Sequence, residues 1–197
     1  MGDRSMVVSM KYLRKLFLAA TVASVLTLQP VLADHHKAAG QTAVAVLETT
    51  NQRVAPQARV LGEVRFQQMG DKIHITGRLE GLEPNSVHGF HIHQYGDLTA
   101  RDGTSAGGHF SPEGHPHAGP EAGKHHAGDL GNVTADKNGV VVIDQTVDFI
   151  TLANGKSAVI GRSVVLHGGK DDLSSQPSGA AGPRIGVGVI GWANSQE

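Results

Sequence analysis

The stretch ARVLGEVRFQQMGDKIHITGRLEGL, residues 58–82, carries the pattern that decides the fold class. Its two parts, 58–69 and 72–82, are rich in residues that favour extended strands. Asp71-Lys72, where the second part begins, is where a tight hairpin would turn. The stretch therefore predicts two adjacent strands rather than a helix.

Similar patterns recur along the rest of the chain. They lie at 43–50, 86–96, 129–147, 157–168 and 184–193. The run 129–147 divides at Lys137-Asn138-Gly139, which is typical of a hairpin turn. About eight strands result, the chain has 26 glycines, and no long helix-period apolar pattern is present. We expect an all-β antiparallel domain, a sandwich or flattened barrel, over residues 43–197.

Composition narrows the class of partner and of site. The formal net charge of −1 and the aromatic content of 4% argue against a nucleic-acid partner. The chain has no cysteine, so any metal must be held by nitrogen and oxygen atoms. These numbers give no reason to expect a nucleic-acid or membrane-surface partner, and they exclude thiolate metal sites.

The N-terminus is typical of a secretory signal. Basic residues precede the 13-residue apolar run LFLAATVASVLTL, and small residues lead to Ala33. The run is shorter than the ~20 residues that span a bilayer. We expect residues 1–33 to be a cleaved signal peptide and 34–42 a flexible lead. The mature chain would then carry 13 basic and 17 acidic side chains, be secreted or periplasmic, and have no membrane attachment.

Histidine is concentrated in one part of the chain. Eight of the 12 histidines lie between His88 and His126. His91 and His93 are two apart on a predicted strand and so point to the same face, where His167 at the end of another strand could join them. A nitrogen-rich site of this kind suits copper or zinc.

A second set of candidate ligands lies in the Gly/Pro-rich loop that follows. Three imidazoles and one carboxylate are a satisfactory zinc set. Spacing alone does not choose between His115 and His117, or between His125 and His126. The other candidates in this loop are His109 and Asp129.

Five segments closely resemble the copper/zinc superoxide dismutases. They are GFHIHQYGDLTA, TSAGGHFSP, HAGDLGNVTAD, VVLHGGKDDL and GPRIGVGVIGWA, in that order and over about residues 43–193. The resemblance implies an eight-stranded antiparallel Greek-key β-barrel, related to the immunoglobulin-like sandwich. It also implies conversion of superoxide to oxygen and hydrogen peroxide by redox cycling of copper beside a structural zinc, as an antioxidant defence.

The same resemblance implies one copper and one zinc ion per subunit and assigns their ligands. The copper ligands are His91, His93, His109 and His167. The zinc ligands are His109, His117, His126 and Asp129, so that His109 bridges both ions and His115 and His125 bind neither. Asp171 corresponds to the carboxylate that orients one histidine from each site. Arg184 corresponds to the active-site arginine and, with His109, is the expected catalytic pair.

Two departures from the family pattern bear on stability and on substrate attraction. The family disulfide is missing, because its two positions are occupied by Asp102-Gly103 in one loop and by Val187 on the last strand. The loop before Arg184 is short, and Lys170 is the only basic residue between His167 and Arg184. We expect bound zinc to hold the long loop in place of the disulfide.

The alternative function is a metal-binding or copper-delivery module without turnover. Such a module is expected to lack a copper ligand or the arginine, and this chain has all of them. The sequence leaves monomer and homodimer open.

Overall fold

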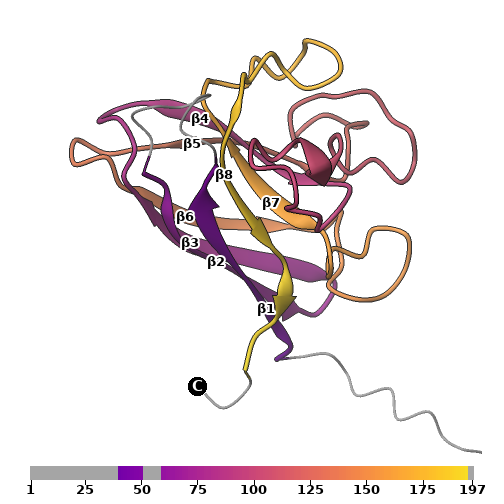
Figure 1. Ribbon diagram of the computed structural model, residues 1–197. Helices are drawn as coiled ribbons and strands as arrows, with labels where there is room; N and C mark the ends of the chain where they lie inside the picture. The colour runs from indigo at the N-terminus through magenta and orange to yellow at the C-terminus, as the bar shows by residue number, and fades with distance from the viewer. Residues whose placement is uncertain (1–39, 51–58, 195–197) are drawn as a thin grey trace, which may run out of the picture. The chain divides into compact units, whose positions relative to one another are not determined.

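The computed structural model describes residues 40–50 and 59–194, which all belong to one compact unit, His35–Glu197. The expected signal peptide, residues 1–33, lies outside the described residues, as does most of the expected lead. In the part of the chain that is described, the only helix is a 3₁₀ turn, η1 (Thr104–Ala106), and everything else is strand or loop (Figure 1). No helix among these residues is long and apolar enough to cross a membrane. The all-β prediction is confirmed.

The hairpin predicted from residues 58–82 is present and lies inside a larger sheet. Strands β2 (Leu61–Met69) and β3 (Lys72–Glu80) pair antiparallel over their whole length, from Leu61 opposite Glu80 to Met69 opposite Lys72. The turn is Gly70-Asp71 rather than Asp71-Lys72, because Lys72 already pairs in β3 and Gly70 supplies the positive φ of 67° that a tight turn needs.

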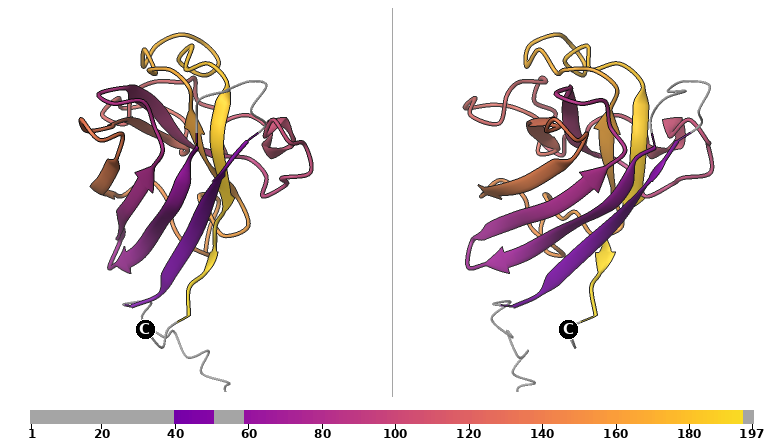
Figure 2. Two further views of the ribbon diagram at one scale, coloured as in Figure 1. Left: turned by 60° about the vertical axis from the view of Figure 1, so that its left-hand side comes forward. Right: turned by 90° about the vertical axis from the view of Figure 1, so that its left-hand side faces the viewer.

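All neighbouring strands pair antiparallel, in the order β5-β4-β7-β8-β1-β2-β3-β6, with β9 added on β1. Figure 2 shows the two halves of this sheet facing each other as a nearly closed barrel. The remaining strands are β1 (Thr42–Thr49), β4 (Val87–His93), β5 (Asp129–Thr134), β6 (Val141–Val147), β7 (Ser163–His167), β8 (Arg184–Val189) and β9 (Gly191–Trp192).

The predicted hairpin within 129–147 is only half right. The tight turn exists, because Asp136 accepts hydrogen bonds from Asn138 and Gly139 and donates its N–H to Val140 at 2.8 Å. The flanking strands β5 and β6, however, stand at opposite ends of the sheet order, and each pairs with a different neighbour. Residues 129–147 therefore connect the two edge strands of the sheet and do not form a two-stranded hairpin.

The core is built from the side chains that point inward at alternate positions along each strand. In β2 and β3 the buried members are Val64, Phe66, Ile73, Ile75 and Leu79. Their neighbours face solvent, as expected for strands with one face on the core. Each fully buried large side chain contributes about 1.5–3 kcal/mol of hydrophobic stabilisation. This core supports the strands whose ends carry the candidate ligands.

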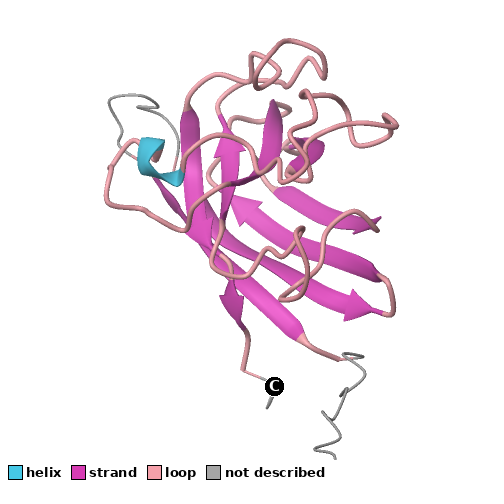
Figure 3. Cartoon of the chain, turned by 90° about the vertical axis from the view of Figure 1, so that its right-hand side faces the viewer, coloured by secondary structure: helices cyan, strands magenta, loops and turns pink. Residues whose placement is uncertain are grey.

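Long loops leave the strands and gather beside the barrel (Figure 3). One runs from the end of β4 to the start of β5, and another from the end of β7 to the start of β8. Both begin at a predicted ligand, His93 or His167. The first ends at Asp129 and the second at Arg184, so the topology brings the predicted site to these loop junctions.

Candidate metal centre

Strand β4 places the first two imidazoles. Its burial differs from that of an ordinary surface strand, because six consecutive residues, His88–His93, are buried. His91 and His93 are 0% and 1% exposed. The chain returns alongside β4, where Phe110 donates its N–H to Ile92 at 2.9 Å and Gln94 donates to Gly108 at 2.9 Å. These bonds hold His109 next to His93.

Four imidazoles converge at this point. One nitrogen from each lies within 4.8 Å of the others, and the rings belong to His91, His93, His109 and His167. The Nδ1–H groups of His93 and His167 donate to the carbonyl oxygens of Gly107 (2.9 Å) and Gly182 (3.1 Å). In each neutral ring the Nε2 atom is then unprotonated and carries a lone pair, and the two Nε2 atoms lie 3.3 Å apart. Two opposed lone pairs at this distance call for a cation between the rings.

A second group adjoins the first through His109. It contains His109, His117, His126 and Asp129, again with one donor atom each within 4.8 Å. Three Nδ1 atoms surround Oδ1 of Asp129, at 2.8 Å (His109), 3.0 Å (His117) and 3.3 Å (His126). The other carboxylate oxygen accepts backbone N–H groups of Ala118 at 3.2 Å and His126 at 2.9 Å. The aspartate is therefore held in place while one of its oxygens remains directed at the imidazoles.

Unpartnered nitrogens test whether metal ions fit these residues. Among the described residues, four of the six buried side-chain atoms without a hydrogen bond are imidazole nitrogens of the two groups: Nδ1 of His91, His117 and His126, and Nε2 of His109. Two of the Nδ1 atoms, those of His117 and His126, lie close to Asp129 but are not aligned to hydrogen-bond it. Unpaired buried acceptors are costly, and a metal ion satisfies them. The all-nitrogen group suits copper, and the group with a carboxylate suits zinc.

Asp171 connects the two groups. Its fully buried carboxylate accepts from His91 Nε2 at 2.7 Å and from His117 Nε2 at 3.0 Å. Burial by itself would raise the pKa of Asp171, but the hydrogen bonds from His91, the Leu173 N–H and His117 outweigh it and lower the pKa. The ionised carboxylate fixes both histidines with Nε2 protonated, which leaves each Nδ1 free for a metal.

Desolvation keeps three imidazoles of the first group, those of His91, His93 and His167, neutral. Burial lowers the pKa of His91 to about 4, although the hydrogen bond to Asp171 opposes it. Burial likewise lowers the pKa of His167 to about 3 and that of His93 well below its ordinary value. Neutral imidazole is the form that binds metal. In the metal-free protein these three imidazoles are therefore ready to bind a metal at neutral pH without first losing a proton.

Arg184 lies at the edge of the first group. It stands opposite His167 in the β7–β8 ladder, and its positive charge helps to lower the pKa of His93 and His167. Its guanidinium donates to the Gly103 carbonyl and, at 2.5 Å, to the Gly107 carbonyl. Burial lowers the pKa of Arg184, but an arginine remains protonated at any physiological pH. The side chain thus presents a permanent positive charge beside the four imidazoles.

Comparison with known proteins agrees with this geometry. The family described as "Copper/zinc superoxide dismutase (SODC)" matches residues 60–190. The chain belongs to this family. It is 45% identical to "Superoxide dismutase [Cu-Zn]" of Paramecium bursaria Chlorella virus 1 over 159 residues, 77% of this chain and 79% of the relative. It is 41% identical to the protein of that name from Candida albicans over 146 residues, 70% of this chain and 94% of the relative.

A solved structure is also similar over most of the chain. The crystal structure of the clock protein EA4 superposes with a TM-score of 0.69 at 39% sequence identity, covering 79% of this chain and 96% of that one. Membership of the copper/zinc superoxide dismutase family confirms the eight-stranded barrel. It also shows that the protein is an oxidoreductase that dismutates superoxide, with copper and zinc as its cofactors.

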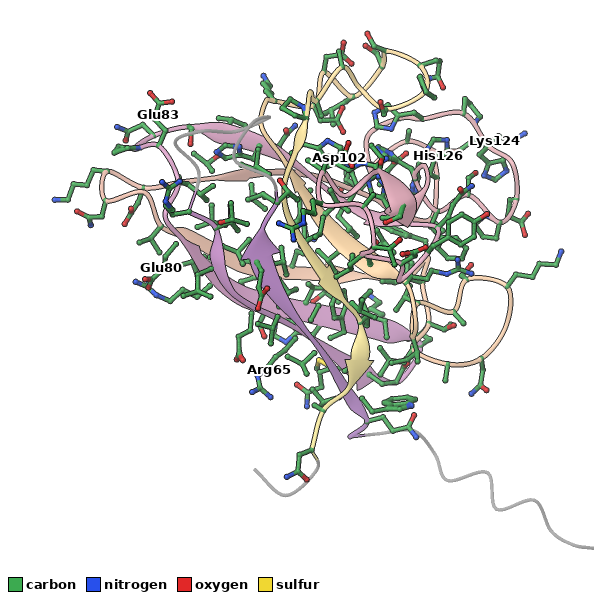
Figure 4. The ribbon with its side chains drawn as sticks, viewed as in Figure 1. Arg65, Glu80, Glu83, Asp102, Lys124 and His126 are labelled. Carbon is green, nitrogen blue, oxygen red and sulfur yellow. The ribbon has the colours of Figure 1, made fainter. Side chains whose placement is uncertain are left out.

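Histidines outside the two groups have other surroundings. His88 is buried and hydrogen-bonds Ser86 Oγ at 2.6 Å and the His167 carbonyl at 2.7 Å, as expected for a structural residue. His115 and His125 line a separate pocket of about 180 Å³ and belong to neither group. His126 faces inward, whereas Lys124 on the same loop projects into solvent (Figure 4). The choice of His117 and His126 over their neighbours thus agrees with the geometry.

The positions of the missing family disulfide face each other. A Cβ built on Gly103 would lie 3.1 Å from Val187 Cγ1, so Gly103 lies against β8, where Asp102 also interacts electrostatically with Arg184. Arg184 bonds the carbonyl of the same Gly103. The loop therefore keeps a hydrogen bond and a close approach to β8 where a copper/zinc superoxide dismutase usually has a covalent bond.

Sequence reasoning missed three residues that support the centre. Asn132 pairs with the backbone of Asp171, donating to its carbonyl at 2.9 Å and accepting its N–H at 2.8 Å. Arg162 lies over the Phe110 ring, 3.4 Å from its centroid, next to His109. Gln176 bonds the backbone of His117. No periodicity or spacing marks these residues, because each acts on a partner distant in sequence.

Proposed function

We propose that the first group binds the catalytic copper and the second the structural zinc of this superoxide dismutase. The copper ligands are His91, His93, His109 and His167, and the zinc ligands are His109, His117, His126 and Asp129. The observation that carries the proposal is the convergence of two buried donor sets that share His109. Its Nδ1 faces Asp129 at 2.8 Å, and its Nε2 is unpartnered.

Copper, when bound, supplies the one-electron oxidation and reduction of successive superoxide ions. The protein supplies position, charge and protons. Arg184 offers a fixed cationic fork for docking a small anion beside the four imidazoles. Nε2 of His109 is the atom at which the ring can hold a proton for the peroxide that forms. Asp171 keeps His91 and His117 in the correct tautomer.

Metal analysis together with a superoxide assay tests this assignment. Protein lacking residues 1–33 is purified, and its copper and zinc contents are measured before and after loading. We expect one equivalent of each ion and copper-dependent activity. Full loading with no turnover would instead favour the metal-binding or copper-delivery module.

Ligand variants test the division between the two groups. We expect His93→Ala to lose copper while keeping zinc, and His126→Ala to lose zinc while keeping copper, because each residue belongs to one group only. Loss of both ions from both variants would contradict the assignment. His74→Ala is the control, because His74 pairs with Asp144 on the sheet surface at 2.8 Å.

We further propose export from the cytoplasm. Residues 1–33 act as the signal and 34–42 as a lead, so the mature protein is secreted or periplasmic and free of the membrane. The basic start, the 13-residue apolar run and Ala33 support this proposal. N-terminal mass spectrometry of the exported protein should find a chain that begins at residue 34, and an intact chain would oppose it.

Assembly as a homodimer is a further proposal. Tyr95 and Val189 expose 58% and 39% of their surface, and a Cβ built on Gly96, next to Tyr95, would lie 3.0 Å from Val189 Cγ1. Light scattering on the metal-loaded protein distinguishes dimer from monomer. We expect Tyr95→Glu to shift a dimer to monomer without changing metal content.

A further inference from the structure

His117 presents a problem of placement. It lies in the loop between β4 and β5, where no regular secondary structure sets its backbone, and Pro116 before it has no N–H to donate. Yet its ring is fully buried between two carboxylates, with Nδ1 at 3.0 Å from Asp129 and Nε2 at 3.0 Å from Asp171. Some contact has to fix the backbone from which this ring projects.

The side-chain amide of Gln176 makes that contact. Its Oε1 accepts the backbone N–H of His117 at 2.9 Å, and its Nε2 donates to the carbonyl of the same residue at 2.8 Å. A backbone N–H can only donate and a carbonyl can only accept, so both ends of the amide are matched to His117. One exposed side chain thereby orients the peptide groups on both sides of this histidine.

The segment that carries Gln176 is itself ordered by its own hydrogen bonds. The carboxylate of Asp172 accepts the N–H groups of Ser174 (3.0 Å) and Ser175 (2.8 Å), and Asp172 donates its own N–H to Gly179 at 2.9 Å. Hydrogen bonds from Ser175 and from both N–H groups lower the pKa of Asp172 to about 2, so its carboxylate stays ionised. Gln176 therefore projects from a closed turn.

The same segment holds the ring of His117 as well as its backbone. Asp171, at the start of the segment, accepts the ring Nε2–H. Gly179, at its end, passes so close that an added Cβ would lie 2.7 Å from His117 Nε2. Residues 171–179 thus contact both the backbone and the ring of His117, while Asp129 accepts the N–H of the following residue, Ala118, and lies 3.0 Å from Nδ1 of the ring.

We infer that Gln176 is a positioning residue for the second metal group, and that zinc binding there depends on its two hydrogen bonds to His117. The inference rests on the proposed function in that this group binds zinc. Two hydrogen bonds of ordinary net strength correspond to an affinity change of about 10- to 30-fold. The effect falls on the second group, because Gln176 bonds no residue of the first.

The test compares three variants in the metal-free mature protein loaded with Zn²⁺ or Co²⁺. Gln176→Ala removes both hydrogen bonds. Gln176→Glu keeps an acceptor for the His117 N–H but places a carboxylate oxygen next to the His117 carbonyl oxygen, where no hydrogen bond can form. Gln68→Ala is the matched control, because Gln68 also bonds backbone carbonyls, those of Gly70 (2.8 Å) and Lys72 (3.2 Å), in the β2–β3 turn.

We expect Gln176→Ala to weaken Zn²⁺ binding about 10- to 30-fold in a chelator competition. Its Co²⁺ visible spectrum should also change, while the Cu²⁺ affinity of the first group stays unchanged. Gln176→Glu should bind no better than Gln176→Ala, whereas a simple charge effect would make it bind better. Gln68→Ala should bind Zn²⁺ as the unaltered protein does.

Two results would overturn the inference. One is an unchanged Zn²⁺ affinity and Co²⁺ spectrum in Gln176→Ala. The other is an equal loss of Zn²⁺ affinity in Gln68→Ala, because that would reflect general stability. Failure of the unaltered protein to bind Zn²⁺ at the second group would instead overturn the proposed function, so the two failures are distinguishable.

Discussion

Gly179 is a position at which the addition of a single methyl group should disrupt the metal centre. Its φ is +67°, and an added Cβ would lie 1.7 Å from Asp171 Oδ1 and 2.7 Å from His117 Nε2. Asp171 is completely buried, so its carboxylate has no free space into which to retreat. We expect Gly179→Ala to break the Asp171–His117 hydrogen bond and to loosen zinc.

The magnitude follows from two contributions. A left-handed conformation costs an alanine about 1–2 kcal/mol. Loss of a hydrogen bond to a buried charged group costs about 1.5–3 kcal/mol more. Gly179→Ala should therefore lower the free energy of unfolding of the metal-free protein by about 2.5–5 kcal/mol, a large part of the ~5–15 kcal/mol typical of a domain.

Gly70 provides a matched control for the backbone contribution. It has the same φ of +67°, but nothing lies within 4 Å of an added Cβ. Gly70→Ala should therefore cost only the ~1–2 kcal/mol of the left-handed backbone and leave zinc binding unchanged. Urea unfolding gives the stability of each variant, and zinc content after dialysis against a chelator gives retention. Equal destabilisation and equal zinc retention in the two variants would refute the reasoning.

Three other predictions concern charge, pH and metal removal. Arg184→Ala should reduce kcat/KM for superoxide about 10- to 100-fold with both metals still bound, and the kcat/KM of Arg184→Lys should lie between those of Arg184→Ala and the unaltered protein. If metal is lost in proportion to activity, the arginine has another role. In the metal-free protein the pKa values of His91 and His167 are lowered to about 4 and 3. Below pH 6.5, the ordinary pKa of histidine, these two side chains bind protons in the unfolded chain but stay neutral in the folded chain. Each histidine should therefore lower the free energy of unfolding by about 2 kcal/mol by pH 5. Urea unfolding between pH 8 and 5 measures this loss, and a flat profile would contradict it. Removal of both metals should sharply increase amide hydrogen exchange in the loop from residue 94 to 128 while the strands stay protected; unchanged protection of that loop would show that zinc does not replace the missing disulfide.

The strands could be predicted from sequence because their signal is local. Alternation in 61–69 and 72–80 reflects which side chains face the core, and it can be counted along the chain without knowing the neighbours. Which strands pair with each other was harder to predict from the sequence. Residues 129–147 have a true turn at Asn138-Gly139, yet the strands beside it pair with β4 and β3 at opposite ends of the sheet order and not with each other.

Some of the candidate ligands could be predicted from the sequence pattern, and others could not. The pair His91 and His93 was predictable from spacing, because residues two apart on a strand share a face. His117 and His126 could be preferred over His115 and His125 only by resemblance to a family, since all four lie in a loop without a period.

By itself, the sequence determined the all-β class, the absence of thiolate ligands and a histidine-rich nitrogen and oxygen site. Only the tertiary structure decided which atoms meet. It brings Asp171 between His91 and His117, turns the Gln176 amide onto the His117 backbone and sets Gly103 against Val187. The physical reason is that these contacts join residues 54 to 84 positions apart. Their strength depends on distances and burial that the folded barrel imposes, and local sequence carries no record of either.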